Sequence, residues 1–182
     1  EHGPTRKFTP PARDKPAGEL MWERLAKEEV DLISTDHAPS TLDQKLGSNI
    51  WDCPFGLPGV ETTLTMLLNA TNEQKITLER VVQAYSETPA RLLGLYPRKG
   101  TIHPGSDADV VLVDAEKEHV LENEDIVSKA GWTPFAGCRV KGRPVMTILR
   151  GTVVAEDGKV VAEPGGGRFI TPGRPEVRAR GM

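Results

Sequence analysis

The residues best suited to chemistry lie in the segment Asp31-Leu32-Ile33-Ser34-Thr35-Asp36-His37-Ala38-Pro39. Residues 30–34 have the apolar pattern of a short buried strand, and a carboxylate, an imidazole and a proline follow it. Barrel enzymes place their catalytic groups at the carboxyl ends of strands. The pattern therefore indicates Asp36 as a candidate catalytic residue. The alternative is that Asp36 only caps the following turn through its side chain.

His37 directly follows Asp36. Side chains alternate between the two faces of a strand, so the two residues are expected to point in opposite directions. If Asp36 points into a site at the strand end, His37 points away from that site. We therefore expect a structural or supporting role for His37.

The elements that would position Asp36 alternate between extended and helical patterns. Residues 6–9 and 30–34 are predicted to be extended, while residues 19–29 and 59–70 carry apolar side chains at helical spacing. This order of strand and helix is typical of an α/β fold with a parallel sheet.

Capping signals predict two further helices in the first half of the chain. Thr77 is a suitable N-cap for the first, and Thr88 with Pro89 suits the start of the second, which Gly94 would end.

The second half of the chain has a different pattern, typical of a small antiparallel β unit. Strands are expected at residues 109–113 and 145–149, and two more at residues 152–155 and 159–162. The last two flank Asp157-Gly158, a pair that strongly favours a tight hairpin turn.

Length and composition exclude several classes of protein. A complete (β/α)₈ barrel needs about 250 residues, and the chain has 182. A net charge of -3 without long runs of one sign argues against a nucleic-acid partner. No membrane partner is expected, because there is no apolar run of about 18 residues and no signal-peptide pattern. Cys53 and Cys138 lack partners at metal-ligand spacing, which favours a reducing, cytoplasmic location.

Several segments match one known family in the same order. Ser34–Pro39 resembles its last barrel strand, Thr9–Lys15 its Pro-Pro-Leu-Arg loop, and Pro54–Thr62 its Gly-x-Pro-Gly-x-Glu loop. The match continues through Glu87–Leu95, Lys99–Asp109, Thr133–Gly137 and Gly142–Val145. The chain thus resembles the metal-dependent amidohydrolase superfamily, in the branch of dihydroorotases, hydantoinases, dihydropyrimidinases and allantoinases.

This resemblance implies the C-terminal part of a (β/α)₈ TIM barrel, with strands 7 and 8 and their helices, followed by part of a small β-sandwich domain. The implied boundaries are residues 1–98 for the barrel segment and 99–162 for the accessory β domain. Residues 163–182, rich in glycine, proline and arginine, are expected to form a flexible tail.

The implied activity is hydrolysis of a cyclic amide or ureide ring by a metal-activated hydroxide. By resemblance, Asp36 binds one ion of a two-zinc centre and also shuttles the proton. The other ligands in the family, histidines and a lysine from earlier strands, have no counterpart here, and a catalytic zinc needs about three protein ligands. We therefore expect a fragment that is inactive alone, whose partners are the missing N-terminal part of the enzyme and, as in the family, further copies of the same protein.

Resemblance also implies substrate contacts at Thr9, Arg13, Ser40, Phe55 and Gly56. Dihydroorotases usually have a histidine at the position of Ser40, and hydantoinases often have Asn at Phe55 and Ser at Thr9. Thr9 keeps the hydroxyl, whereas Phe55 offers only backbone groups and an apolar face. These departures leave the subfamily open.

Three alternatives to a hydantoinase-type enzyme remain. The first is a strict dihydroorotase, since the counterpart of Arg13 can meet a substrate carboxylate. The second is a non-catalytic scaffold related to dihydropyrimidinase, which the presence of Asp36 disfavours. The third is an unrelated β-rich binding module, which would require the order of the matching segments to be accidental.

Overall fold

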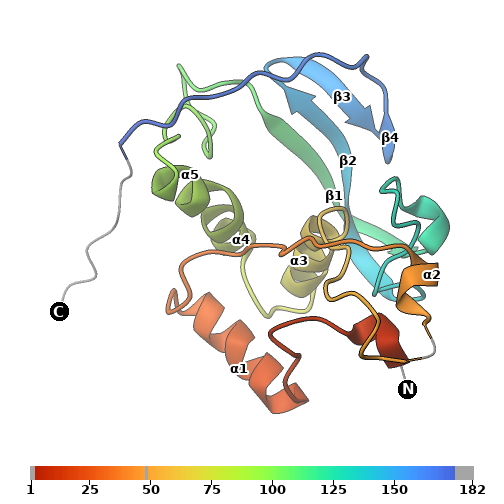
Figure 1. Ribbon diagram of the computed structural model, residues 1–182. Coiled ribbons are helices and arrows are strands. Elements are labelled where there is room, and N and C mark those ends of the chain that lie inside the picture. Colours follow the sequence, from red (N-terminus) through yellow and green to blue (C-terminus); the bar gives the residue numbers. More distant parts are fainter. Residues whose placement is uncertain (1–2, 48, 175–182) are drawn as a thin grey trace.

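The computed structural model describes residues 3–47 and 49–174. Helices and long loops form the first half, and an antiparallel sheet forms most of the second (Figure 1). The described residues contain no helix that is long and apolar enough to cross a membrane.

Helix α1 spans Lys15–Ala26 and starts four residues before the predicted helix. The Asp14 side chain caps it by accepting from the Ala17 N–H at 3.1 Å, and a proline stands in its first turn. Of the residues near its predicted apolar face, Leu25 is buried whereas Leu20 and Met21 are exposed. The capping signal at Asp14 therefore locates the start better than the apolar spacing did.

Helix α3 spans Thr63–Asn72 and carries part of the buried core. The sequence predicts a start at residue 59, but residues 60–62 form a turn instead. One core cluster joins α1, α3 and the helix that follows; its buried members are Leu25, Leu67, Ala70, Ile76, Val81 and Ala84.

The two helices predicted after residue 77 are joined into one helical run. It comprises α4 (Leu78–Val82), the π-helical η2 (Gln83–Glu87) and α5 (Thr88–Leu92). The Thr77 cap is confirmed, since its side chain accepts from the Arg80 N–H at 3.2 Å. Pro89 has no N–H to give to the preceding turn, and a wide π turn accommodates this without ending the helix. The helical run ends before Gly94, which has φ +66°.

The strands predicted at residues 6–9 and 30–34 are absent from the described residues. Residues 3–6 form a short 3₁₀ helix, η1 (Gly3–Arg6), and residues 30–34 have no regular structure. Ile33 donates its N–H to the Ala84 carbonyl at 3.0 Å, and His37 forms an isolated parallel bridge with Leu57. A parallel strand needs neighbouring strands for its hydrogen bonds, and the described residues provide none beside these two segments. The barrel strands at residues 6–9 and 30–34 therefore remain a prediction.

The sheet of the second half is confirmed as antiparallel, with strand order β1-β2-β3-β4. The strands are β1 (Val110–Val120), β2 (Arg139–Leu149), β3 (Thr152–Glu156) and β4 (Lys159–Val160). Asp157 and Gly158 have φ values of +47° and +80°, which confirms the predicted hairpin turn. β2 is longer than predicted and continues through Pro144. This residue cannot donate to the ladder and lies at an irregularity in the pairing with β1.

The sheet packs on the helical half through β2 and α3, which lie together in the centre of Figure 1. Gly142 is required there, because a Cβ at this position would lie 2.6 Å from the Leu68 Cβ. Asn69 accepts the Lys141 N–H at 2.9 Å, and Asn72 donates to the Lys141 carbonyl at 3.2 Å. These contacts fix the sheet relative to α3.

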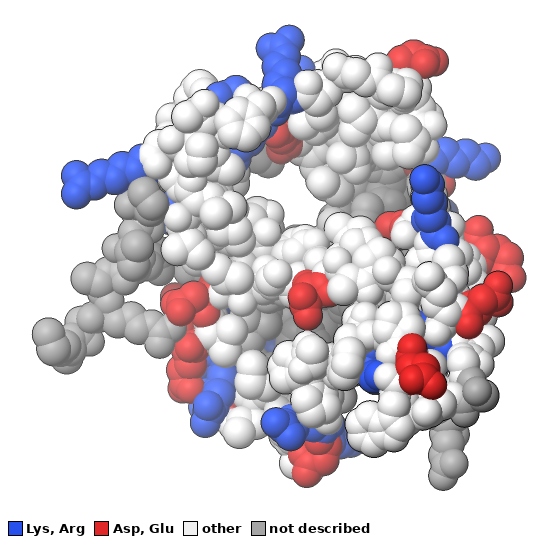
Figure 2. All heavy atoms as spheres, viewed as in Figure 1, with Lys and Arg blue, Asp and Glu red and all other residues white. Residues whose placement is uncertain are grey.

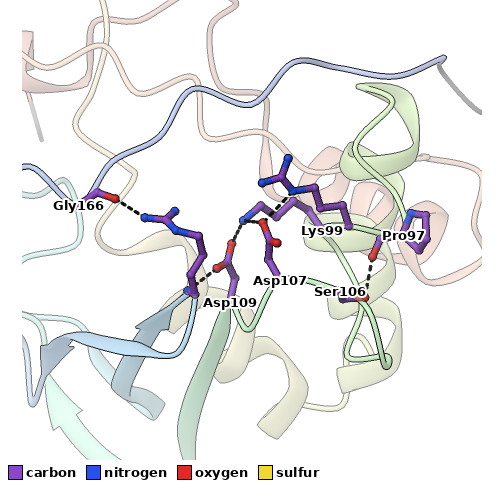
Figure 3. A network of polar contacts seen from close by, with 8 residues as sticks. Pro97, Lys99, Ser106, Asp107, Asp109 and Gly166 are labelled. Atoms are coloured by element: carbon purple, nitrogen blue, oxygen red, sulfur yellow. Dashed lines mark hydrogen bonds and ion pairs between the residues drawn. The ribbon is translucent and has the colours of Figure 1, made fainter.

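An ion-pair network holds together the segment that connects α5 to β1 (Figure 3). Asp107 pairs with Arg98 at 3.0 Å and with Lys99 at 2.8 Å, and Lys99 also pairs with Asp109. Asp109 in turn accepts the Arg150 N–H at 2.8 Å. The junction between the two halves is therefore held by charge-assisted bonds.

Part of the predicted tail at residues 163–182 is described, and residues 175–182 lie outside the described residues. Residues 163–174 have no helix or strand. In Figure 1 this dark blue segment passes the sheet and returns to the side of α5, where Gly173 donates to the Gly94 carbonyl at 2.7 Å. This part of the tail is thus anchored.

Candidate functional site

Asp36 is exposed, and its backbone has φ +44°. Its carboxylate makes no hydrogen bond or ion pair with residues that the structure describes. The local turn bond comes instead from Thr35, whose hydroxyl accepts the His37 N–H at 3.2 Å. Asp36 therefore does not cap the following turn. Left-handed backbone conformations cost about 1–3 kcal/mol and persist only where surrounding contacts hold them.

His37 supplies one of those contacts. Its Nδ1 accepts the N–H groups of Gly59 at 3.0 Å and Val60 at 3.2 Å. Nδ1 must then be unprotonated, so in the neutral ring the proton is on Nε2. The supporting role predicted for His37 agrees with this geometry, which ties the residue after Asp36 to the turn before α3.

The loop after Asp36 returns beside it at residues 56–57. Ala38 donates to the Leu57 carbonyl at 3.1 Å. Gly56 has φ +101°, and a Cβ there would lie 2.4 Å from the Ala38 carbonyl oxygen. Only glycine allows this approach, which brings the candidate substrate residues Phe55 and Gly56 next to the Asp36 segment.

Lys7 and Lys45 hold the far part of this loop through backbone carbonyls. Lys7 Nζ donates to Ile50 and Cys53 at 2.7 Å each and to Trp51 at 3.1 Å. The same ammonium lies 4.3 Å from the centre of the Phe55 ring. Phe55 thus has a defined position although it is 58% exposed.

Lys45, in the short helix α2 (Leu42–Lys45), is fully buried. Its Nζ donates to the carbonyls of Lys7 and Pro54 at 2.8 Å each, and Cys53 is buried beside it. Burial lowers the pKa of the Lys45 ammonium, and the nearby Lys7 charge adds to this effect. We did not predict this cluster, because the local sequence carries no signal that separates these lysines from surface lysines.

The remaining candidate substrate residues are not brought together in the same way. Thr9 and Arg13 are exposed, and among the described residues neither forms a hydrogen bond or ion pair with Asp36. The Ser40 hydroxyl is buried and has no hydrogen-bond partner among them, whereas its carbonyl accepts from Trp132 Nε1 at 2.8 Å. A buried hydroxyl without a partner marks a place where a bound molecule or water can complete a hydrogen bond.

A metal ion would find only part of its ligand set in this chain. The described ranges contain no group of three or more His, Cys, Asp or Glu residues that could hold a metal. Asp36 is an exposed carboxylate with no partner among the described residues, and it fits as a single oxygen ligand for zinc. Further ligands would have to come from outside the described residues.

Comparisons with known proteins show the family of the chain. Residues 21–154 match the model of the amidohydrolase family. The chain is 38% identical over 172 residues to an L-hydantoinase from Paenarthrobacter aurescens, covering 93% of this chain and 38% of that enzyme. It is 43% identical over 159 residues to a dihydroorotase from Halobacterium salinarum, covering 87% of this chain and 37% of that enzyme.

A solved structure gives the same result for the fold. The L-hydantoinase (dihydropyrimidinase) from Arthrobacter aurescens superimposes with a TM-score of 0.89 at 38% identity, over 93% of this chain and 38% of that one. The chain therefore spans less than half the length of the relatives it matches. On the family match, these identities and this superposition, the chain belongs to the amidohydrolase family.

Proposed function

We propose that this chain forms part of a cyclic amidohydrolase, an enzyme that opens a cyclic amide or ureide ring by hydrolysing a C–N bond. The supporting observation is the Asp36 carboxylate, which is exposed, unpaired among the described residues and held at φ +44°. Relatives named hydantoinase and dihydroorotase match the chain that carries it over about nine-tenths of its length.

In this proposal Asp36 provides one ligand of a zinc centre, and the other ligands come from the rest of the enzyme. Bound zinc would lower the pKa of water from about 15.7 to about 7 and polarise the ring carbonyl. The Asp36 carboxylate accepts a proton from the attacking water and passes it to the departing ring nitrogen. His37, by accepting from Gly59 and Val60, holds the backbone that orients Asp36.

The substrate side of the site is proposed to include Thr9, Arg13, Ser40, Phe55 and Gly56. Phe55 presents an exposed ring that Lys7 holds in place, and Ser40 offers a neutral hydroxyl. These groups favour a neutral ring with an apolar substituent over a ring that carries a carboxylate. In the same proposal, residues 1–98 belong to the barrel, residues 99–162 to an accessory β domain, and the chain supplies the C-terminal part of the enzyme.

The test is an assay on the whole protein. Ring opening of dihydroorotate, a 5-substituted hydantoin, dihydrouracil and allantoin is measured together with the bound metal content. Zinc content with hydrolysis of at least one of these rings supports the proposal. A folded, metal-loaded protein that opens none of them would exclude it and leave the scaffold as the remaining candidate.

A further inference from the structure

The loop between β1 and β2, residues 121–138, leaves the sheet and packs on the candidate site. Its ends are joined by hydrogen bonds from Leu121 N–H to the Cys138 carbonyl at 3.0 Å and from Gly137 N–H to the Leu121 carbonyl at 2.8 Å. Ala130 and Trp132 inside it are buried. We call these residues the 121–138 loop. It contains Thr133–Gly137, a segment that the proposed chemistry does not use.

Trp132 connects this loop to the Asp36 segment. Its side chain is buried at 3% exposure, and Nε1 donates to the Ser40 carbonyl at 2.8 Å, across 92 residues of sequence. The Ser40 hydroxyl has no partner among the described residues, so the Trp132 bond is the polar contact that fixes Ser40. Ser40 lies four residues after Asp36.

Glu61 makes the second connection, which reaches the Asp36 segment through the bonds from Gly59 and Val60 to His37. One oxygen of its carboxylate accepts the Val127 N–H and the other accepts the Ser128 N–H, both at 2.8 Å. Bonds to an ionised carboxylate are stronger than neutral ones. Between the two surfaces, a void of about 10 Å³ is lined by His37, Pro58 and Gly59 on one side and by Ile126, Trp132 and Thr133 on the other. The contact is therefore closely packed.

We propose that Trp132 and Glu61 are positioning residues, through which the 121–138 loop holds residues 36–40 in place for the reaction. This inference rests on the proposed function. Asp36 has a strained backbone that needs external support, and Ser40 is a candidate substrate residue. A small misplacement of such groups can cost about a hundredfold in kcat/KM. Because the Trp132 bond is made to Ser40, a candidate substrate residue, most of this loss should fall on substrate binding.

The experiment uses the whole protein and compares W132F and E61Q with W22F. The W132F change keeps an aromatic ring but removes the N–H donor, and the E61Q change keeps the shape of the side chain but removes its charge. Trp22 packs against the helical core away from these contacts, so W22F controls for loss of an indole. We measure kcat and KM for a cyclic amide, the melting temperature, and amide hydrogen exchange of peptides covering residues 36–46.

Both W132F and E61Q should speed exchange in residues 36–46 at least tenfold and raise KM at least tenfold, with a smaller change in kcat. W22F should lower the melting temperature without either effect. The inference is overturned if exchange and KM stay at wild-type values in W132F and E61Q. It is also overturned if both quantities change equally in W22F. A wild-type protein that opens no cyclic amide refutes the proposed function instead, and the exchange comparison still decides whether the loop positions the segment.

Discussion

Asp36 is the side chain on which the proposed chemistry depends. In the whole protein, Asp36→Ala should lower kcat by several orders of magnitude, because one change removes a metal ligand and the proton shuttle. The melting temperature should change little, since the side chain is exposed and unpaired among the described residues. The measurements are steady-state kinetics, metal content and a thermal melt.

His37→Ala is the matched comparison for that variant. It should lower kcat less than Asp36→Ala does. It should lower the melting temperature more, because the N–H groups of Gly59 and Val60 lose their acceptor. Near-normal hydrolysis by Asp36→Ala would rule out the mechanism.

Ser40 and Phe55 carry the prediction on substrate. The whole enzyme should prefer a 5-substituted hydantoin to dihydroorotate by roughly tenfold to a hundredfold in kcat/KM, because a missing charge-assisted hydrogen bond is worth about 1.5–3 kcal/mol. Arg13 is exposed and is the residue able to reverse this preference. If dihydroorotate is the better substrate by tenfold or more, the enzyme is a dihydroorotase and Arg13→Gln should remove that preference.

At the scale of elements, α2 depends on the buried ammonium of Lys45. Lys45→Met keeps most of the aliphatic stem but leaves the Pro54 carbonyl without its donor, while the Lys7 carbonyl keeps the bond from the Gly56 N–H at 3.2 Å. A stranded carbonyl costs about 1–3 kcal/mol, so the free energy of unfolding should fall by about that amount. The exposed Lys159 provides the control, and Lys159→Met should change unfolding by less than about 0.5 kcal/mol. Chemical denaturation measures both, and equal effects would show that the Pro54 carbonyl is satisfied in another way.

The segment that connects α5 to β1 should be less stable in acid. The Lys99 ammonium, with Arg98 beside it, lowers the pKa of the Asp107 carboxyl from its ordinary 3.8. Because the folded pKa is below the unfolded one, the stabilisation is present above about pH 4 and is lost as the pH falls through the folded pKa. Asp107→Asn should therefore lower the melting temperature at pH 7, and the difference from wild type should shrink toward pH 3. A difference that stays constant with pH would show that the charge of Asp107 contributes nothing.

At the scale of the whole molecule, the chain alone exposes much apolar surface. Figure 2 shows broad stretches of uncharged side chains between the charged ones on one face. Trp51, Ile102 and Phe169 are 83%, 83% and 92% exposed, and many other large apolar side chains are also exposed. Such surface favours association. We expect the 182-residue chain, expressed alone, to associate or precipitate, and a monodisperse, cooperatively melting monomer in sedimentation and calorimetry would contradict this.

The features that the sequence determined by itself depend on near neighbours. Thr77 caps α4 through a bond three residues away, and Asp157-Gly158 turns the β3–β4 hairpin because both residues accept positive φ. The candidate role of Asp36 also came from adjacent residues and from segments that match the family in order. Such signals need no knowledge of distant parts of the chain, so they could be predicted.

Only the tertiary structure decided the contacts between distant residues. The pattern of residues 30–34 suits a strand, but a strand forms only beside a partner strand. In the described residues, the parallel pairing near this segment is a single bridge from His37 to Leu57. Likewise, the bond from Trp132 to Ser40 spans 92 residues. The donor and acceptor types are visible in the sequence, but no local signal separates Lys45 from the other lysines or Trp132 from the other two tryptophans. Their pairing is set by how α3 and the sheet pack, which places the 121–138 loop on the Asp36 segment.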